Sequence, residues 1–242
     1  HPKLKLKVDD LPFRQLKRSS DYKELRSRVR AELRNRYSMF IKPGYSENQE
    51  YLEKYAKSKD DEYLLKILKT HRSTAERLDF YQELYRELFG RIGSVESILD
   101  LGCGLNPLTY GWLPCNPEYH ATDLNDDDME LINQFFRIAG VEGEAFSLDL
   151  IKEYQKLKDY DVDVVFAFKL FDTLEGQQRG ITKRLIDNLE TEWLVATFPT
   201  KSLSGKPMRS RPTWFESLWD EYYDFSFDNE LIYLCRADDK KP

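Results

Sequence analysis

Residues 97–104 read Ser-Ile-Leu-Asp-Leu-Gly-Cys-Gly, a short apolar run that ends in an acid and two glycines. The run is typical of a buried strand followed by a tight turn. Glycines in such a turn let the backbone pass against a ligand where a side chain would collide. The stretch therefore predicts the first strand of a nucleotide-binding sheet, with Asp100, Gly102 and Gly104 at its ligand edge.

The sequence on both sides of this strand favours an α/β fold. Further short apolar runs bounded by turns predict strands at 119–124, 145–150, 163–170, 193–199 and 231–236. Helical spacing lies between them, at 129–139 and 177–189, as in a doubly wound parallel sheet. The first 95 residues look mainly helical, with patterns at 21–40, 48–68 and 73–89.

Two further acids end the next predicted strands and suggest a ligand. Asp123 follows Asp100 at the spacing where a carboxylate accepts the hydroxyl protons of a ribose, and Asp149 is placed for the exocyclic amine of adenine. The loop is short and acidic, which disfavours a pyrophosphate, and Pro107 occupies the third glycine position of the dinucleotide motif. S-adenosylmethionine is therefore the expected cofactor. A dinucleotide is the alternative ligand, and polar helix caps are the alternative reading of Asp123 and Asp149.

Composition excludes several classes of protein. The 242 residues allow one large domain, or a domain with a smaller attachment, and 40% hydrophobic residues can form a core. The longest apolar run, 164–168, is far too short to cross a bilayer, and no basic-then-apolar leader opens the chain. Three scattered cysteines show no metal or redox spacing. We expect a cytoplasmic protein with no membrane association and no metal.

The net charge of −6 is unevenly distributed. Residues 1–43 carry +8, whereas the remaining chain carries −14. A basic amphipathic helix at 21–40 and a basic loop at 201–212 are typical of phosphate-backbone binding, although a solvated helix face is the alternative. The candidate RNA-binding residues are Lys23, Arg26, Arg28, Arg30, Arg34 and Arg36 in the helix, and Lys201, Lys206, Arg209 and Arg211 in the loop.

Six motifs occur in an order that resembles one family. They are HRSTAERL at 71–78, LDLGCGLNPL at 99–108, FKL at 168–170, FPTKSL at 198–203, WFE at 214–216 and ELIYL at 230–234. The sequence resembles the Arm family of aminoglycoside-resistance 16S rRNA methyltransferases over about residues 70–236. The resemblance implies a Rossmann-like class I methyltransferase sheet with a helical N-terminal extension, and methylation of N7 of a guanine in the decoding region.

The resemblance also implies roles for individual residues in cofactor binding. Arg77 would hold the methionine carboxylate, a task suited to a two-pronged cation, and an ion pair at the surface is its alternative reading. His71 would frame the start of the helix that Ser73 or Thr74 caps. Further expected contacts with the cofactor come from Asn106, Pro107, Leu124, Leu150, Phe168 and Lys169.

The catalytic residues are expected at two other strand ends. Lys169 interrupts an apolar strand end and would face the cofactor and the target base, with a lysine that snorkels from the sheet edge as the alternative. Phe198 would stack on the extruded base, while Thr200 and Lys201 would contact phosphate or base edges. Leu170 and Phe171 would line the pocket or belong to the core, and Trp214 and Phe215 are weaker stacking candidates.

The sequence thus predicts a guanine-N7 methyltransferase with S-adenosylmethionine as cofactor and S-adenosylhomocysteine as product. Residues 1–70 would be an RNA-docking extension and residues 71–242 the methyltransferase domain. The expected partner is 16S rRNA within the 30S subunit, and the family suggests a monomer. Methylation of tRNA or of another atom, or a non-catalytic RNA-binding module that retains the cofactor, are the alternatives.

Overall fold

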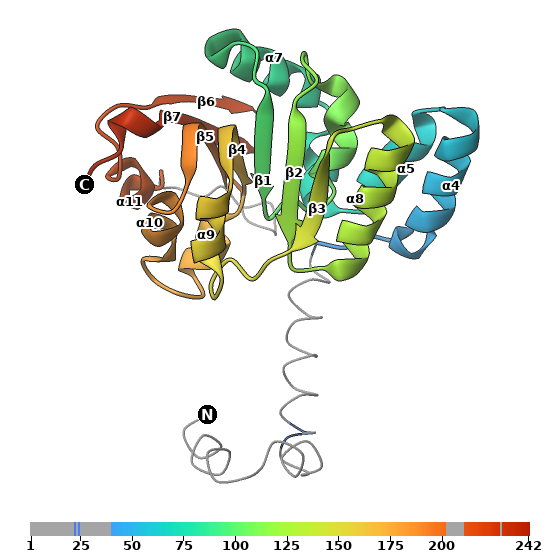
Figure 1. The fold of residues 1–242 in the computed structure, drawn as a ribbon, viewed down its shortest axis with the longest axis horizontal. Coiled ribbons are helices and arrows are strands. Elements are labelled where there is room, and N and C mark those ends of the chain that lie inside the picture. The colour runs from blue at the N-terminus through green and yellow to red at the C-terminus, as the bar shows by residue number, and fades with distance from the viewer. Residues whose placement is uncertain (1–21, 23, 25–39, 202–210, 228) are drawn as a thin grey trace.

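The computed structural model describes residues 22, 24, 40–201, 211–227 and 229–242 around one sheet (Figure 1). The strands are β1 (Ser97–Leu101), β2 (Glu118–Asp123), β3 (Gly143–Ser147), β4 (Asp161–Phe168), β5 (Glu190–Pro199), β6 (Tyr223–Phe227) and β7 (Glu230–Arg236). The α-helices are α4 (Asn48–Ser58), α5 (Glu62–Leu68), α6 (Arg72–Arg77), α7 (Tyr81–Ile92), α8 (Asp126–Ala139), α9 (Phe171–Glu175), α10 (Ile181–Ile186) and α11 (Thr213–Glu216). Short 3-10 helices are η1 (Tyr45–Glu47), η2 (Asn106–Trp112), η3 (Tyr154–Asp159) and η4 (Ala237–Asp239).

The sheet has seven strands in the order β3-β2-β1-β4-β5-β7-β6. The first five strands are parallel, as predicted. β7 runs antiparallel to β5, and β6 runs antiparallel to β7, so the parallel pattern predicted from the alternation of strands and helices ends at β5. β6 was not predicted at all, because its apolar residues alternate with polar ones and form no continuous run.

Helices cover both faces of the sheet and form three layers (Figure 1). In β4, Val164 and Phe166 belong to the core shared with α4, α5, α7 and α8, whereas Val165 and Ala167 belong to the core under α9, α10 and α11. Successive side chains of a strand point to opposite faces, so the unbroken apolar run of β4 is what a strand buried on both sides requires.

The parallel strands bring their carboxyl ends to one edge of the sheet, the lower edge in Figure 1. The helix that follows β2 begins at this edge, where the Asn125 side chain accepts the backbone N–H of Asp127 at 3.2 Å. It ends at Gly140, whose φ of 72° suits glycine. The acids predicted at strand ends are thereby gathered along this edge.

Several predicted elements differ from those observed. The pattern at 48–68 is two helices, because Lys59 adopts a left-handed φ of 56° and ends α4. The pattern at 73–89 is also two helices, separated between Arg77 and Tyr81, and only 181–186 of the range 177–189 is helical within α10. The strand predicted at 145–150 ends at Ser147, so Asp149 lies in the turn that follows it.

The described part of the N-terminal extension is not separate from the sheet. Leu52, Leu64, Ile67 and Leu68 are buried in the same core as α7 and α8. Of the helix predicted at 21–40, the structure describes Tyr22 and Glu24, which are helical, and Phe40. Among the described helices, none is both long and apolar enough to span a bilayer.

Candidate active site

The glycine turn after β1 is closely packed by protein side chains. Gly102 and Gly104 have φ values of 61° and 52°. A Cβ on Gly102 would lie 2.6 Å from Cδ1 of Leu170, and one on Gly104 would lie 2.7 Å from Cε1 of His71. Glycine is needed here both for the left-handed backbone and for the close approach of these two side chains.

Asp100 is buried at the start of this turn. Its Oδ2 accepts hydrogen bonds from Asn106 Nδ2 and Tyr119 OH, both at 2.8 Å, while its Oδ1 is buried without a partner among the described residues. Burial raises the pKa of Asp100 to about 7, although these two donors act in the opposite direction. Asp100 therefore holds the turn through Asn106 and leaves one acceptor atom unsatisfied.

Asp123, at the end of β2, joins the two loops of the site. Its Oδ2 accepts the Gly104 N–H at 2.9 Å and its Oδ1 accepts the Leu124 N–H at 2.6 Å. Burial raises the pKa of this carboxyl, while the two backbone donors lower it. Leu124 projects into solvent with 61% of its surface exposed, beside the carboxylate expected to bind a ribose.

Asp149 caps a turn in this structure. Its carboxylate accepts the N–H groups of Ile151 and Lys152 at 3.1 and 3.3 Å and pairs with the Lys152 ammonium. Burial tends to raise the pKa of Asp149, but the Lys152 contact outweighs it and the pKa is lowered. Asp149 therefore caps a turn and not a helix, and Leu150 is buried next to it.

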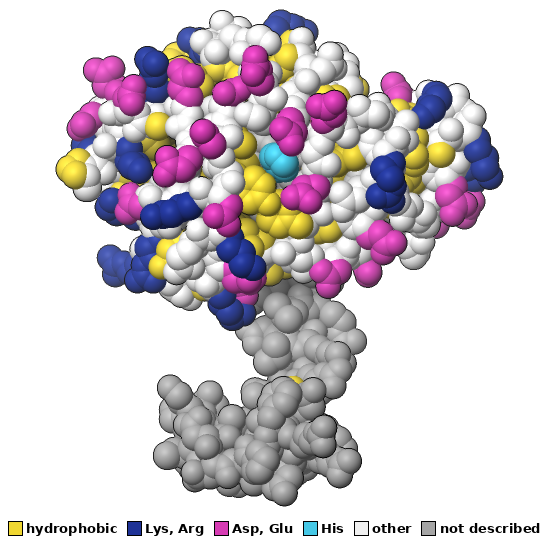
Figure 2. All heavy atoms as spheres, in the orientation of Figure 1, with side chains coloured by type: hydrophobic (Ala, Val, Ile, Leu, Met, Phe, Trp, Pro, Cys, Tyr) yellow, Lys and Arg dark blue, Asp and Glu magenta, His cyan; other side chains and the backbone are white. Residues whose placement is uncertain are grey.

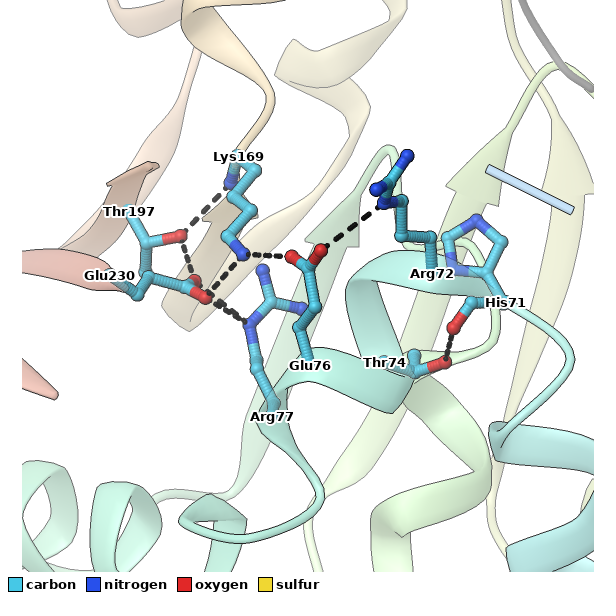
Figure 3. Close-up of polar contacts among 8 residues, drawn as sticks. All are labelled: His71, Arg72, Thr74, Glu76, Arg77, Lys169, Thr197 and Glu230. Atoms are coloured by element: carbon cyan, nitrogen blue, oxygen red, sulfur yellow. Dashed lines mark hydrogen bonds and ion pairs between the residues drawn. The ribbon is translucent and has the colours of Figure 1, made fainter. Parts of the chain in front are cut away.

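A network of buried charges lies at the neighbouring strand ends (Figure 3). Arg77 Nε, on α6, donates to both carboxylate oxygens of Glu230 at 2.8 and 3.0 Å. Lys169 Nζ lies 3.1 Å from the same carboxylate and 2.9 Å from Glu76 Oε2. The Thr197 hydroxyl also donates to Glu230. The buried carboxylate of Glu230 thus contacts two cations and a hydroxyl group.

Arg77 is 1% exposed, so the predicted alternative of a surface pair is wrong: the pair is buried. Its guanidinium lies 4.8 Å from the centre of the Phe168 ring. Burial opposes its charge, but Glu230 outweighs that effect and raises the pKa of Arg77. Its Nη2 makes no hydrogen bond of full geometry among the described residues, but the Tyr81 hydroxyl lies beside it and also raises the pKa of Arg77, so a ligand carboxylate would share this donor with Tyr81.

Lys169 is the residue that turns the chain from β4 towards α9. Its φ of 54° is left-handed, and its backbone N–H donates to the carbonyl of Thr197 at 3.1 Å and to the Thr197 hydroxyl at 2.9 Å. Only 12% of its side chain is exposed. The alternative of a lysine that snorkels into solvent is therefore wrong.

The start of α6 is built differently from the prediction. His71 precedes the helix, and no side chain caps it. Thr74 donates its hydroxyl to the carbonyls of Leu68 and His71, so the predicted cap by Ser73 or Thr74 is wrong. Burial, followed by the charge of Arg77, lowers the pKa of His71 to about 4. The His71 side chain is therefore neutral, and its imidazole ring packs against Gly104.

Pro107 and Asn106 begin η2, and both are buried. Pro107 stands in the first turn of this short helix, where proline is favoured because its fixed φ suits the helix and its missing N–H would have no partner there.

The predicted stacking residue lies in the core. Phe198 is 2% exposed, and its ring contacts those of Trp214, Phe215 and Tyr233. In this conformation the ring has no free face for a base, so the prediction for Phe198 is wrong. Phe215 and Phe171 are also buried, whereas Trp214 is 37% exposed.

The second basic element is described only at its ends. Lys201 is exposed, whereas Arg211 pairs with Glu216 at 2.6 Å and with Asp224 at 3.0 Å. Thr200 donates its N–H to the Asn229 carbonyl at 2.9 Å. On the face that Figure 2 shows, described Lys and Arg side chains are interspersed with Asp and Glu. The other predicted RNA contacts lie outside the described residues: Lys23, Arg26, Arg28, Arg30, Arg34, Arg36, Lys206 and Arg209.

Sequence reasoning missed Glu230, Glu76, Thr197 and Tyr119 as site residues. Glu230 leads directly into the apolar strand of β7, and an unpaired carboxylate is too costly to bury in such a position. That signal could have pointed to a buried cation. Glu76 stands beside Arg77 in the chain, but its contact with Lys169 spans 93 positions and leaves no trace in the local pattern.

These side chains fit S-adenosylmethionine. The amino-acid end of that molecule presents a carboxylate, for which Arg77 Nη2, beside the Tyr81 hydroxyl, is a buried donor. Its ribose presents hydroxyl donors, for which Asp123 offers a half-buried carboxylate. Asp100 Oδ1 is a further buried acceptor at the same edge of the sheet. The arginine donor and the carboxylate acceptors at this edge are therefore complementary to the carboxylate and the hydroxyl groups of the expected cofactor.

Comparisons with known proteins agree with this chemistry. The sequence model of the family described as "Ribosomal RNA methyltransferase (FmrO)" matches residues 62–229. The 16S rRNA (guanine(1405)-N(7))-methyltransferase of Frankia casuarinae is 33% identical over 181 residues, which are 71% of this chain and 63% of that protein. The enzyme of the same name from Micromonospora rosea is 29% identical over 86% of this chain and 80% of its own length. The chain thus spans slightly less than two thirds of the Frankia protein.

Two solved structures share the fold. The 16S rRNA methyltransferase RmtF in complex with S-adenosyl-L-homocysteine has a TM-score of 0.74 and 27% identity, over 91% of this chain and 86% of that one. The 16S rRNA methylase ArmA has a TM-score of 0.61 and 30% identity, over 78% of this chain and 97% of that one.

Proposed function

The chain belongs to the FmrO family of ribosomal RNA methyltransferases, and we propose that it methylates N7 of a guanine in 16S rRNA with S-adenosylmethionine as the methyl donor. The fold is that of the class I methyltransferases. The observation that carries the proposal is that one sheet edge holds both a half-buried carboxylate on β2 and a buried arginine whose Nη2 makes no hydrogen bond of full geometry among the described residues. The relatives' shared name supports the choice of guanine N7.

The residues of this chain position the reactants. When bound, the cofactor supplies an electrophilic methyl group. Arg77 would bind its carboxylate, Asp123 its ribose hydroxyls, and the turn at Gly102 and Gly104 would approach it with backbone only. Lys169 is held at the same edge by Glu76 and Glu230, where it would orient the target base.

The reaction needs no general base. Guanine N7 carries a lone pair and no proton, so alignment of nucleophile and methyl group is the main requirement. His71, the histidine of the site, is buried with a pKa lowered to about 4, and it packs against the glycine turn. This structural role is in keeping with a reaction that transfers no proton to the enzyme.

We further propose that the substrate is the assembled 30S subunit, that residues 1–70 dock on it, and that the protein acts in the cytoplasm as a monomer. The +8 charge of residues 1–43 supports an electrostatic contact with RNA.

The test is methyl transfer to defined RNAs. Labelled S-adenosylmethionine is incubated with the protein and either 30S subunits, free 16S rRNA or bulk tRNA, and the modified base is mapped by borohydride and aniline cleavage. We expect label at a guanine N7 of 16S rRNA within 30S subunits. Label on tRNA alone would favour the alternative substrate, and no label on any of the three RNAs would contradict the enzymatic function.

Binding measurements test the site separately. Asp123→Ala should weaken S-adenosylhomocysteine binding at least tenfold by calorimetry, because hydrogen bonds to a charged group are worth about 1.5–3 kcal/mol. Arg77→Ala and Lys169→Ala should reduce turnover. Asp161→Ala, at the opposite end of β4, is the matched control and should bind as the wild type does. Unchanged binding and turnover in all three site variants would refute this assignment.

A further inference from the structure

The segment from Phe40 to Tyr45 is anchored beside the cofactor loops. Ile41 pairs with His71 in an isolated antiparallel bridge. The Lys42 N–H donates to the Thr70 carbonyl at 2.7 Å, and the Arg72 N–H donates to the Phe40 carbonyl at 2.6 Å. These backbone bonds hold the segment against the residues that begin α6.

The first end of the segment supports the loop after β1. The Phe40 ring stacks on the His71 imidazole with centroids 6.0 Å apart and planes inclined by 16°. His71 in turn occupies the space in which a Cβ of Gly104 would lie. Phe40 thus backs the side chain that packs against the glycine turn.

The other end of the segment supports the loop after β2. The Tyr45 hydroxyl donates to the carboxylate of Asp128, which is 1% exposed, and accepts a hydrogen bond from Asn125 Nδ2 at 3.0 Å. Asn125 caps the N-terminus of α8, and Asp128 lies in its first turn. One hydroxyl therefore fixes both the cap and the first turn of the helix that follows Asp123.

The two supported loops are joined to each other by Asp123, which accepts the Gly104 N–H. Together, these contacts form a closed circuit through the segment 40–45, the loop after β1 and the loop after β2. Asp123 lies at the point where the loops meet. Only Leu124 separates Asn125, which donates to the Tyr45 hydroxyl, from this carboxylate in the chain.

We propose that Tyr45 is a positioning residue for the cofactor: its hydroxyl, acting through Asn125 and Asp128, sets the position of the Asp123 loop. The inference rests on the proposed function, because it concerns the affinity for S-adenosylmethionine. It places one determinant of that affinity outside the methyltransferase sheet, in the segment that connects the basic N-terminal residues to the fold.

The test compares two tyrosine variants. Tyr45→Phe removes the hydroxyl and keeps the ring, whereas Tyr51→Phe removes the hydroxyl that donates to Glu47 on the exposed face of the same region. By calorimetry we expect Tyr45→Phe to raise the Kd for S-adenosylhomocysteine about fivefold and Tyr51→Phe to leave it unchanged. In methylation assays the KM for S-adenosylmethionine should rise, with kcat and the KM for RNA unaltered.

Variants of Asp128 provide the second measurement. Asp128→Asn keeps an acceptor for the Tyr45 hydroxyl and should retain most of the affinity, whereas Asp128→Ala should repeat the loss seen in Tyr45→Phe. Wild-type affinity in Tyr45→Phe, or an equal loss in Tyr51→Phe, would overturn the inference. A wild-type protein that binds S-adenosylhomocysteine but methylates no RNA would contradict the proposed function alone, and the affinities of the variants would still decide the role of Tyr45.

Discussion

Two buried acids at the same edge of the sheet, Asp100 on β1 and Glu230 on β7, are held in opposite ways. Asp100 is bound by the neutral donors Asn106 and Tyr119, and burial raises its pKa to about 7. Glu230 is bound by two cations, Arg77 and Lys169. The β1 side of the site is therefore sensitive to pH, whereas the β7 side depends on every member of its ion network being present.

The largest effect is expected where a charge is removed from the β7 side. Glu230→Gln leaves Arg77 without its buried counter-ion and Lys169 with Glu76 alone, and removing one partner of a buried pair costs about 3–5 kcal/mol. Urea unfolding would measure the loss. Glu87→Gln is the matched control, because Glu87 accepts from Arg91 in an exposed i,i+4 pair and such pairs are worth less than about 1 kcal/mol. Equal losses in the two variants would remove the distinction between buried and exposed pairs.

The next effect is a pH dependence from the β1 side. The pKa of Asp100 is raised from 3.8 to about 7 by burial, so the folded state binds the proton more tightly and the free energy of unfolding falls as pH rises through this range. The pKa of His71 is lowered from 6.5 to about 4 by burial, so the free energy of unfolding rises with pH over nearly the same range. Each slope is about 1.4 kcal/mol per pH unit, and the two oppose each other.

Single variants should separate the two contributions to the pH dependence of the free energy of unfolding between pH 4.5 and 6.5. In Asp100→Asn the contribution of His71 remains, and the free energy of unfolding should rise with pH relative to the wild type. In His71→Asn the contribution of Asp100 remains, and the free energy of unfolding should fall. Denaturant unfolding at several pH values provides the measurement. Parallel pH profiles for the wild type and both variants would show that neither group titrates as its burial requires.

The smallest effect separates Asp149 from the other acids. Lys152 is exposed, and its pair with Asp149 lies at the surface. Lys152→Ala should therefore change the affinity for S-adenosylhomocysteine less than about fivefold, since such pairs are worth about 0–1 kcal/mol. Asp149→Ala should weaken binding by about tenfold if this carboxylate leaves Lys152 to bind an adenine amine. If calorimetry shows that Lys152→Ala and Asp149→Ala change the affinity by the same small factor, Asp149 serves only to cap the turn.

The parts of the fold predicted from the sequence were those with a dense local signal. The apolar runs of β1, β4 and β5 show little periodicity because both faces are buried, and their turns contain glycine or charge. β6 and the breaks in the N-terminal helices were missed. At Lys59 a lysine adopts a left-handed conformation that local propensity disfavours, and its ammonium donates to the Ile138 carbonyl 79 positions away.

The site was predicted only where its residues also carry a local sequence signal. Asp100 and Arg77 stand in recognisable motifs, Asp123 ends a predicted strand, and the structure brings the three to one edge of the sheet. Phe198 was misassigned because an aromatic residue at a strand end has the same local pattern whether it faces solvent or, as here, packs against Tyr233. Glu230 was missed because its partners come from α6 and the end of β4.

The sequence by itself determined the α/β class, the glycine turn, the acids at the strand ends and the kinship with rRNA methyltransferases, because each depends on residues close together in the chain. Tertiary structure alone decided which charges are paired. Arg77 and Glu230 are 153 positions apart, and Tyr45 and Asp128 are 83 apart. A buried charge or hydroxyl takes its partner from whichever element packs against it, and that choice is settled only when the sheet and its helices assemble.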